Sequence, residues 1–264
     1  MKIVAILLLA ILTFSCSDDD EKSTEENKGQ WAMIFKETVK SDSNPVDRTE
    51  KFMFDGERLI QHIIKQRYFE EEISNEVNLS YSDNQVTVTT DYLTLIYTLN
   101  SEGYASQCVY SLSSQNRIYQ FSYSAEGYLT GIVENIDDTE YSSTSLTYEN
   151  GDITSISSKM NGLENKFIYE PGEESSTYHL PCLGLLEIHP LTFHIEALYA
   201  GLLGKDPRHF TIRSCPAGSN DEKTVYSYGF DKKGNPSRMI CQTTYAGGQA
   251  SYYPYTRNIS ISFE

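Results

Sequence analysis

Histidines are the side chains of this sequence whose type and spacing most invite a test for metal chemistry. Four of them fall in the second half of the chain: His179, His189, His194 and His209. A zinc site needs three or four ligands with tight local spacing. The step from His189 to His194 does not place both side chains on one helix face. We therefore expect no metal site and no cofactor, and we predict surface or capping positions for these histidines.

Acidic residues are the other candidates for chemistry, and they come mostly in adjacent groups. Examples are Glu70-Glu71-Glu72, Asp137-Asp138 and Glu173-Glu174. Neighbouring residues on a strand point to opposite faces, so such pairs cannot act together. A glycosidase pair is defined by its distance across a cleft, which spacing alone does not give. No Gly-x-Ser-x-Gly nucleophile motif or glycine-rich phosphate loop is present. The sequence therefore favours a protein that is not an enzyme, with a hydrolase as the alternative.

The N-terminus has the organisation of an export signal. Lys2 is followed by a nearly all-apolar run from Ile3 to Phe14, which ends just before Cys16. A run of this length is too short to span a bilayer, so it indicates a signal peptide covering residues 1–15. The junction resembles a bacterial lipobox, in which the cysteine is acylated and becomes the new N-terminus. We expect lipid on Cys16 to be the only membrane attachment.

An acidic segment follows the proposed lipidated cysteine. It resembles the export signal of Bacteroidetes lipoproteins that reach the outer face of the outer membrane, and its residues are Ser17, Asp18, Asp19, Asp20 and Glu21. Acidic, serine-rich segments with few aromatics also serve as solvated linkers. The sequence thus predicts that residues 16–29 form a lipidated acidic linker, outside the cell.

The overall charge excludes one class of partner. The chain carries 37 acidic residues against 21 basic ones, a net charge of −16. Nucleic-acid binding requires a basic footprint, and an anionic lipid surface also attracts basic segments. We therefore expect no nucleic-acid partner and no electrostatic docking on membranes.

Four cysteines remain beyond Cys16, namely Cys108, Cys182, Cys215 and Cys241. None shows the C-x-x-C spacing of a metal site. An exported chain permits disulfides, and Cys182 and Cys215 flank the region with a helical pattern. A disulfide between these two is one prediction, and four buried thiols are the alternative.

A loosely repeated pattern runs through the middle of the chain. Aligning Gly103, Gly127, Gly151 and Gly234 places aromatic or apolar residues at shared positions before and after each glycine. Aromatic-x-aromatic puts two side chains on one strand face, and glycine supplies the positive φ of a tight turn. Each unit therefore predicts a β-hairpin.

The pattern resembles two known groups of proteins. The segment Tyr228-Gly-Phe-Asp-Lys-Lys-Gly-Asn-Pro-Ser-Arg-Met239 is similar to the tyrosine-aspartate hairpin repeats of the Rhs family. In the central copies Asn100 and Ser124 replace the aspartate. Leader, hairpins and late helical pattern together resemble a Bacteroidetes lipoprotein family of unknown function with a porin-like β fold. That resemblance implies an architecture and a location, and it implies no catalytic residues.

The expected architecture is one mainly β domain over residues 30–264, a twisted antiparallel meander forming an open or incomplete barrel-like sheet. One helical insertion is expected near residues 190–203, because Leu191, Ile195, Leu198 and Leu202 share the spacing of an amphipathic helix. Such a helix would cover an exposed part of the open sheet.

Tyrosines near the C-terminus suggest a contact surface. Tyr252, Tyr253 and Tyr255 cluster around Pro254, where exposed rings could stack on sugars or anchor a protein. The alternative is ordinary sheet lining. The sequence favours a surface lipoprotein that binds a glycan or protein without catalysis. A hydrolase and a structural component of the cell envelope are the other hypotheses.

Overall fold

The structure is a computed structural model, and it describes most of the chain after the leader. The described residues are 29–39, 46–68, 71–112, 115–175, 180, 183–186, 188–219, 221–244 and 255–264. The predicted signal peptide, Cys16 and the acidic segment lie outside them, as does nearly all of the predicted linker.

Sixteen β-strands account for most of the described chain. Their bounds are β1 Gln30–Val39, β2 Val46–Asp55, β3 Arg58–Tyr68, β4 Glu71–Tyr81, β5 Gln85–Thr89, β6 Thr94–Leu99, β7 Ala105–Leu112, β8 Gln115–Tyr123, β9 Leu129–Ile136, β10 Thr139–Glu149, β11 Asp152–Met160, β12 Leu163–Ser175, β13 His209–Pro216, β14 Lys223–Phe230, β15 Pro236–Thr244 and β16 Tyr255–Phe263. Each strand pairs antiparallel with its neighbours in sequence, so the sheet is a meander.

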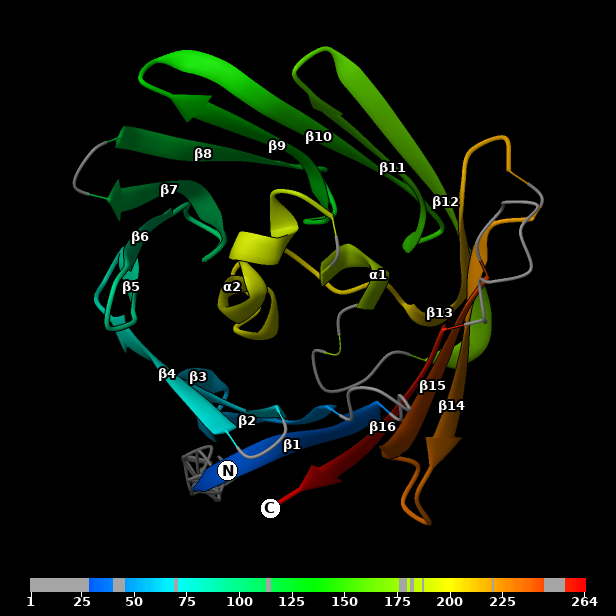
Figure 1. The fold of residues 1–264 in the computed structure, drawn as a ribbon. Helices are drawn as coiled ribbons and strands as arrows, with labels where there is room; N and C mark the ends of the chain where they lie inside the picture. The colour runs from blue at the N-terminus through cyan, green and yellow to red at the C-terminus, as the bar shows by residue number, and fades with distance from the viewer. Residues whose placement is uncertain are drawn as a thin grey trace, which may run out of the picture.

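The sheet closes on itself, which corrects the expectation of an open or incomplete sheet. β1 pairs with β16 from Met33↔Phe263 to Thr38↔Asn258, giving one closed barrel (Figure 1). The backbones of Ala32 and Glu264 also exchange two hydrogen bonds, of 2.8 and 2.9 Å. In an open sheet, β1 and β16 would each present a row of unpaired backbone groups. Closure pairs these groups with each other, so no helix is needed to cover an edge.

Tight turns at one end of the barrel share a single design. Gly103, Gly127 and Gly234 have φ of 85°, 90° and 84°, in the left-handed region. Each turn begins with a polar residue whose side-chain oxygen accepts two backbone N–H groups; these residues are Asn100, Ser124 and Asp231. This shared role explains why asparagine and serine stand where the last turn has aspartate.

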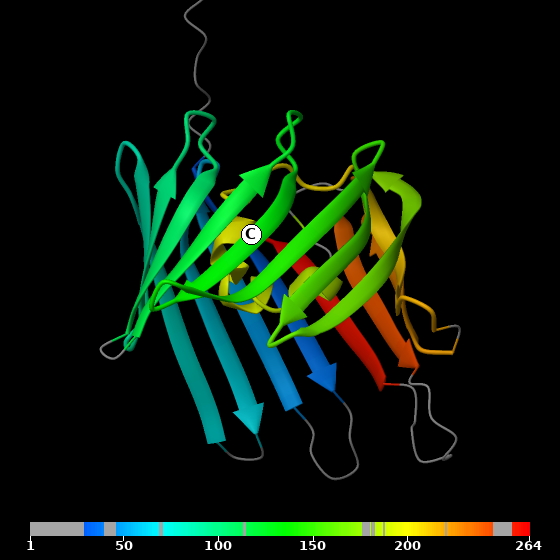
Figure 2. The same ribbon diagram turned by 90° about the horizontal axis from the view of Figure 1, so that it is seen from above.

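The two ends of the barrel differ. Successive connections of an antiparallel meander alternate between ends, so the glycine turns, the start of β1 and the end of β16 share one end (Figure 2). We call it the glycine-turn end. The opposite end carries the other connections, including the β9–β10 turn at Asp137-Asp138 and the β11–β12 turn at Asn161-Gly162.

A segment between β12 and β13 folds into the barrel interior, as Figure 1 shows. We call its described part the plug: residue 180, residues 183–186 and residues 188–208. It contains α1 Leu183–Leu186, the 3-10 turn η1 Leu191–Phe193 and α2 Ile195–Tyr199. The expected single helix near residues 190–203 is therefore wrong. His194, with φ −123° and ψ 28°, separates η1 from α2. The strands of the barrel, which we call the wall, surround this segment. Its apolar residues can therefore be buried without sharing one helix face.

Hydrogen bonds attach the plug to the glycine-turn end. The backbone N–H of Lys205 donates to Gly127 O at 2.9 Å, and that of Arg208 donates to Gly151 O at 3.1 Å. Leu202 O accepts from the N–H of Ala105 at 2.7 Å. The plug thus extends the backbone bonding of the turns and fixes its own position in the barrel.

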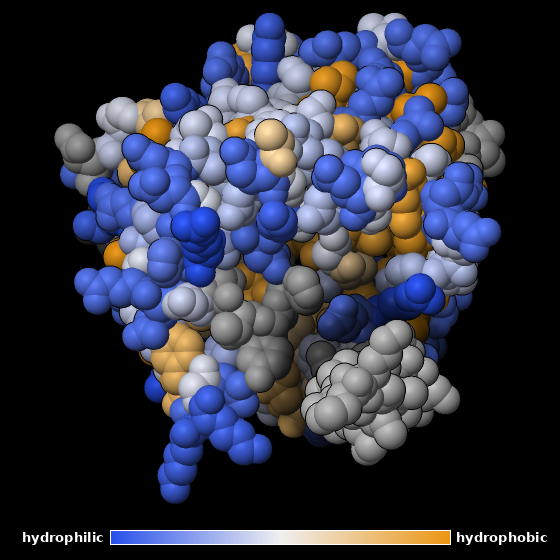
Figure 3. All heavy atoms as spheres, turned by 180° about the vertical axis from the view of Figure 1, so that it is seen from behind, coloured by the Kyte–Doolittle hydropathy of each residue, from blue (hydrophilic) through white to orange (hydrophobic). Residues whose placement is uncertain are grey.

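The core lies inside the barrel, between wall and plug. Inward residues such as Met33, Phe52 and Tyr97 are fully buried, and so are the plug residues Leu191 and Ala197. Exposed outward positions are mostly polar; among them are Lys36, Asn78, Ser80, Gln120, Ser122, Ser145, Thr147, Arg238, Gln242, Asn258 and Ser260. Hydrophilic residues also cover most of the face presented in Figure 3. Among the described residues, no helix is long and apolar enough to cross a membrane.

Candidate functional site

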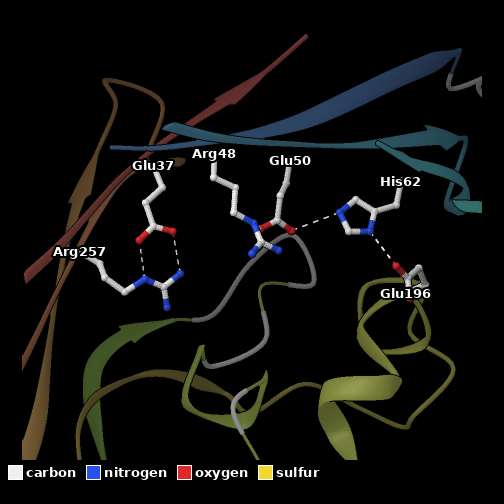
Figure 4. A network of polar contacts seen from close by, with 6 residues as sticks. All are labelled: Glu37, Arg48, Glu50, His62, Glu196 and Arg257. Carbon is white, nitrogen blue, oxygen red and sulfur yellow. Dashed lines mark hydrogen bonds and ion pairs between the residues drawn. The ribbon is translucent and has the colours of Figure 1, made fainter. Parts of the chain in front are cut away.

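A row of charged side chains runs along the inside of the wall on β16, β1, β2 and β3 and ends on the plug (Figure 4). Its first pair is Glu37 with Arg257. The Arg257 Nε and Nη2 groups donate to the two carboxylate oxygens at 2.6 and 2.8 Å. This two-point geometry is the strong form of a charge-assisted hydrogen bond, and Glu37 is only 8% exposed.

The row continues through Arg48, Glu50, His62 and Glu196. Arg48 Nε lies 2.7 Å from Glu50 Oε1. The two ring nitrogens of His62 contact Glu50 Oε2 at 3.2 Å and Glu196 Oε1 at 2.8 Å. Glu196 belongs to α2, whereas the other three residues belong to the wall. His62 therefore connects plug and barrel through two carboxylates.

His62 is held in a setting that favours its protonated form. Burial opposes the charged imidazolium, but the hydrogen bonds and charges of Glu196 and Glu50 outweigh it, and the pKa of His62 is raised. Burial likewise opposes ionisation of Glu50, yet His62 and Arg48 lower the pKa of that carboxyl. The His62 ring also stacks on Phe52, with centroids 4.0 Å apart. The two carboxylates thus stabilise the imidazolium form of this group.

A cavity of about 200 Å³ lies between this row and the plug. Its lining combines charged side chains with apolar and aromatic ones: Phe35, Glu37, Arg48, Glu50, Leu186, Ile195, Tyr199, Arg257 and Ile259. Glu37 lies near the end of β1, and Arg48 and Arg257 lie near the starts of β2 and β16. The cavity is therefore at the opposite end of the barrel from the glycine turns.

The charged groups that line this cavity are paired with one another. Each charged group of the row has an opposite charge in contact, so the lining offers hydrogen-bond donors and acceptors without a strong net charge. Catalysis of glycoside hydrolysis needs a carboxylic acid with a raised pKa, whereas the pKa of Glu50 is lowered. In the described part of the chain no group of three metal-ligating side chains comes together.

The residues predicted from the sequence are elsewhere or undescribed. Cys16, the export signal Ser17–Glu21, Cys182, Tyr252 and Tyr253 lie outside the described residues. Tyr255 begins β16, and Cys215 is half-buried in β13. Lipidation, the disulfide and the tyrosine contact surface therefore stay predictions.

The structure agrees only in part with the predicted surface or capping positions: His194 stands at the N-cap of α2, His189 and His209 are partly exposed, and His179 lies outside the described residues. His194 is fully buried, and its Nδ1 lies 2.8 Å from the Tyr97 hydroxyl. His189 contacts Glu134, and His209 Nδ1 lies 2.8 Å from Asp152 Oδ2. All these contacts join the plug, or its junction with β13, to the wall. Burial also lowers the pKa of His194 to about 3, so this ring is neutral.

The charged row could not be predicted from the sequence, because no local spacing of its residues indicates it. Glu37 and Arg257 are 220 positions apart, and His62 and Glu196 are 134 apart. Only closure of the barrel and entry of the plug bring them together. The one local signal is Arg48-x-Glu50, which alternation places on a single strand face.

Comparison with known proteins agrees with the barrel. The family described as "Domain of unknown function (DUF4595) with porin-like fold" matches residues 52–238. The chain belongs to this family. Its description bears out the porin-like part of the expected resemblance, while the Rhs-type likeness of the hairpins stays a prediction. No curated protein matches the chain.

Two solved structures share the architecture. A porin-like protein from Bacteroides uniformis is 28% identical, with a TM-score of 0.80, over 88% of this chain and 96% of that one. A porin-like protein from Bacteroides vulgatus is 13% identical, with a TM-score of 0.50, over 86% of this chain and 96% of that one. The second likeness concerns the fold alone.

Proposed function

We propose that this protein is a lipoprotein, anchored through Cys16 on the outside of the cell, that binds one residue of a glycan in the cavity beside Glu37 and Arg257. It acts without catalysis. The observation that carries the proposal is the cavity itself, whose lining combines paired charges with the aromatic side chains of Phe35 and Tyr199.

The contents of the barrel support a binding protein over a channel. Membrane-spanning barrels have an apolar outer band and a polar interior. Here the interior holds apolar side chains and the plug, and the exposed outward positions are mostly polar. This reversed pattern fits a barrel that stands in water and is held at the membrane by a separate anchor.

The direction of the strands supports presentation of the cavity to the outside. β1 begins at the glycine-turn end, so a tether from Cys16 would reach the barrel there. The cavity lies at the opposite end. An anchored barrel would therefore turn the cavity away from the membrane, where a glycan could reach it.

The size and lining of the cavity support a single sugar as its occupant. Pockets for drug-sized ligands span roughly 300–1,000 Å³, and this cavity is smaller at about 200 Å³. Sugar hydroxyls both donate and accept, so they match guanidinium and carboxylate groups that are already paired with each other. The apolar face of a sugar ring would pack on the aromatic side chains.

A glycan array tests the binding function. We would probe it with the mature protein and with two variants, Ile195→Trp and Leu163→Trp. Ile195 lines the cavity, so the larger side chain should fill it and abolish the signal. Leu163 is 73% exposed on the β11–β12 hairpin, away from the plug, and serves as the control, which should bind as wild type. Binding that survives in folded Ile195→Trp would refute the assignment to this cavity.

Protease treatment of intact cells tests the location. Wild-type protein should be degraded, whereas a Ser17–Glu21 to alanine variant should be protected if the acidic segment directs surface export. A Cys16→Ala variant should leave the membrane fraction. Protection of the wild-type protein would instead favour the second candidate, a structural component of the envelope, to which the largely filled interior is suited.

A further inference from the structure

We infer that a second binding site, for a small organic carboxylate, lies around Arg117, at the same end of the barrel as the first cavity, away from the glycine turns. It is separate from the cavity beside Glu37, and it depends neither on that cavity nor on lipidation. Its wall residues come from β7 to β10, and the plug contributes His189 and Phe193. The proposal starts from the number of hydrogen-bond donors that meet there around one carboxylate.

That carboxylate is Glu134, which is fully buried. Its Oε2 atom accepts from the Ser142 hydroxyl at 2.7 Å and also contacts His189 Nε2. Its Oε1 atom lies 3.3 Å from Arg117 Nη1, with no well-formed hydrogen bond among the described residues. The contact with Arg117 is thus the loosest of the three.

Arg117 and Tyr119 have donors to spare. A guanidinium carries five N–H groups; among the described residues, the one on Arg117 faces one carboxylate oxygen, on Glu134, and the Tyr119 hydroxyl. The Tyr119 hydroxyl is buried beside Arg117 and Glu134, and it forms no well-aligned hydrogen bond with any described residue. Buried polar groups are normally satisfied, so a further anionic oxygen would fit between these donors.

A β-bulge has placed an aromatic ring at this cluster. The pairing of β10 with β9 shifts between Glu140 and Ser142, so Tyr141 has no partner of its own in β9. Bulges re-aim side chains and are frequent near functional sites. The Arg117 guanidinium lies 6.0 Å from the Tyr141 ring centroid and 5.6 Å from that of Tyr110. The two rings help hold the guanidinium in place.

The site is partly exposed, and a hollow lies beside it. The side chains of Arg117 and His189 are 20% and 25% exposed, and Phe193 beside His189 is 40% exposed. Tyr141 also borders a hollow of about 340 Å³, which Lys159 and Asn161 help to line. A ligand carboxylate at Arg117 would leave its remaining atoms at the rim of the barrel. Sugar acids and acidic amino acids both carry this group.

Titration calorimetry on mature Ile195→Trp protein, in which the cavity beside Glu37 is filled, tests the site with two probes, glucuronate and N-acetylglutamate, against glucose as the uncharged control. We expect saturable binding of at least one acid and none of glucose. Arg117→Gln should weaken it at least about tenfold, because a charge-assisted contact is lost. Arg238→Gln removes an exposed arginine on β15 and should leave affinity unchanged.

Folding of each variant is checked by its thermal unfolding. If Arg117→Gln does not fold, Arg117→Lys is used, which keeps the charge but loses the two-point geometry and should still weaken binding. Wild-type affinity in either folded Arg117 variant would overturn the proposal. So would the absence of binding by both acids, or equal binding of glucose. Preference between the two acids identifies the source of the carboxylate.

Discussion

Replacing Leu191 with alanine tests whether the plug is part of the core or an insertion that does not contribute to stability. Leu191 lies in η1 and is fully buried. The lost carbon atoms are worth about 2.4 kcal/mol at roughly 0.8 kcal/mol per buried CH₂. The unfilled space adds about 1–2 kcal/mol. A hollow of about 20 Å³ already borders this residue, which indicates that neighbours do not close fully around it.

We therefore expect Leu191→Ala to lower the free energy of unfolding by about 3.5–4.5 kcal/mol, which corresponds to roughly 7–18 °C in Tm for a domain of this size. Urea unfolding followed by circular dichroism measures the change. Leu163→Ala, at a 73% exposed leucine, should change stability by less than about 0.5 kcal/mol. A Leu191 effect as small as that of Leu163 would refute a core formed jointly by plug and wall.

Three further perturbations test the contacts between plug and wall. The raised pKa of His62 means that its stabilisation is complete below about pH 6.5, the unfolded value, and is lost as pH rises through the folded value. The stability difference between wild type and His62→Gln should therefore shrink from pH 6 to pH 9, and a difference that grows would contradict the pairing. Gly204→Ala should cost at least about 2 kcal/mol, because its φ is +92° and a Cβ would lie 2.6 Å from Gly127 O. Gly162→Ala, at φ +78° with no atom nearby, should cost less in the same thermal melts. Tyr123→Phe removes a hydroxyl that donates to Leu202 O of the plug at 3.3 Å and to Ala105 O of the wall at 2.6 Å, and denaturant titration should show a loss of about 0.5–1.5 kcal/mol.

The local parts of the fold could be predicted because they depend on neighbouring residues. A glycine that needs positive φ, preceded by a polar residue that caps the turn, marks a hairpin in any setting. Closure could not be predicted, because it depends on pairing between β1 and β16 and on the accumulated twist of every strand between them. The predicted helix failed for a related reason. Leu191 and Leu202 are buried as a helix pattern requires, but the wall also buries Ala197, Tyr199 and Leu203.

The candidate site could not be predicted from the sequence for the same physical reason, because it also depends on contacts between distant parts of the chain. Its charges are stable inside the barrel only as pairs, and, apart from Arg48 with Glu50, the pairs that close the row at Glu37–Arg257 and at His62–Glu196 have members far apart in sequence. Glu37 and Arg48 alone look like ordinary charged residues of strands. Histidines were treated as surface groups because their carboxylate partners lie on other strands or on the plug, as His62 and Glu196 illustrate.

Because β1 pairs with β16, the barrel is a ring in which no strand is intrinsically the first. The bonded backbones of Ala32 and Glu264 could be joined by a short peptide, and the chain could be reopened at the Asp137-Asp138 turn. Such a circular permutant would keep every strand pair, the plug and both proposed sites. Its new termini would lie at the end opposite the glycine turns. The same anchor would therefore hold the molecule in the inverted orientation, with its binding face toward the membrane. Orientation in this architecture is therefore set by where the polypeptide is cut, independently of what it binds.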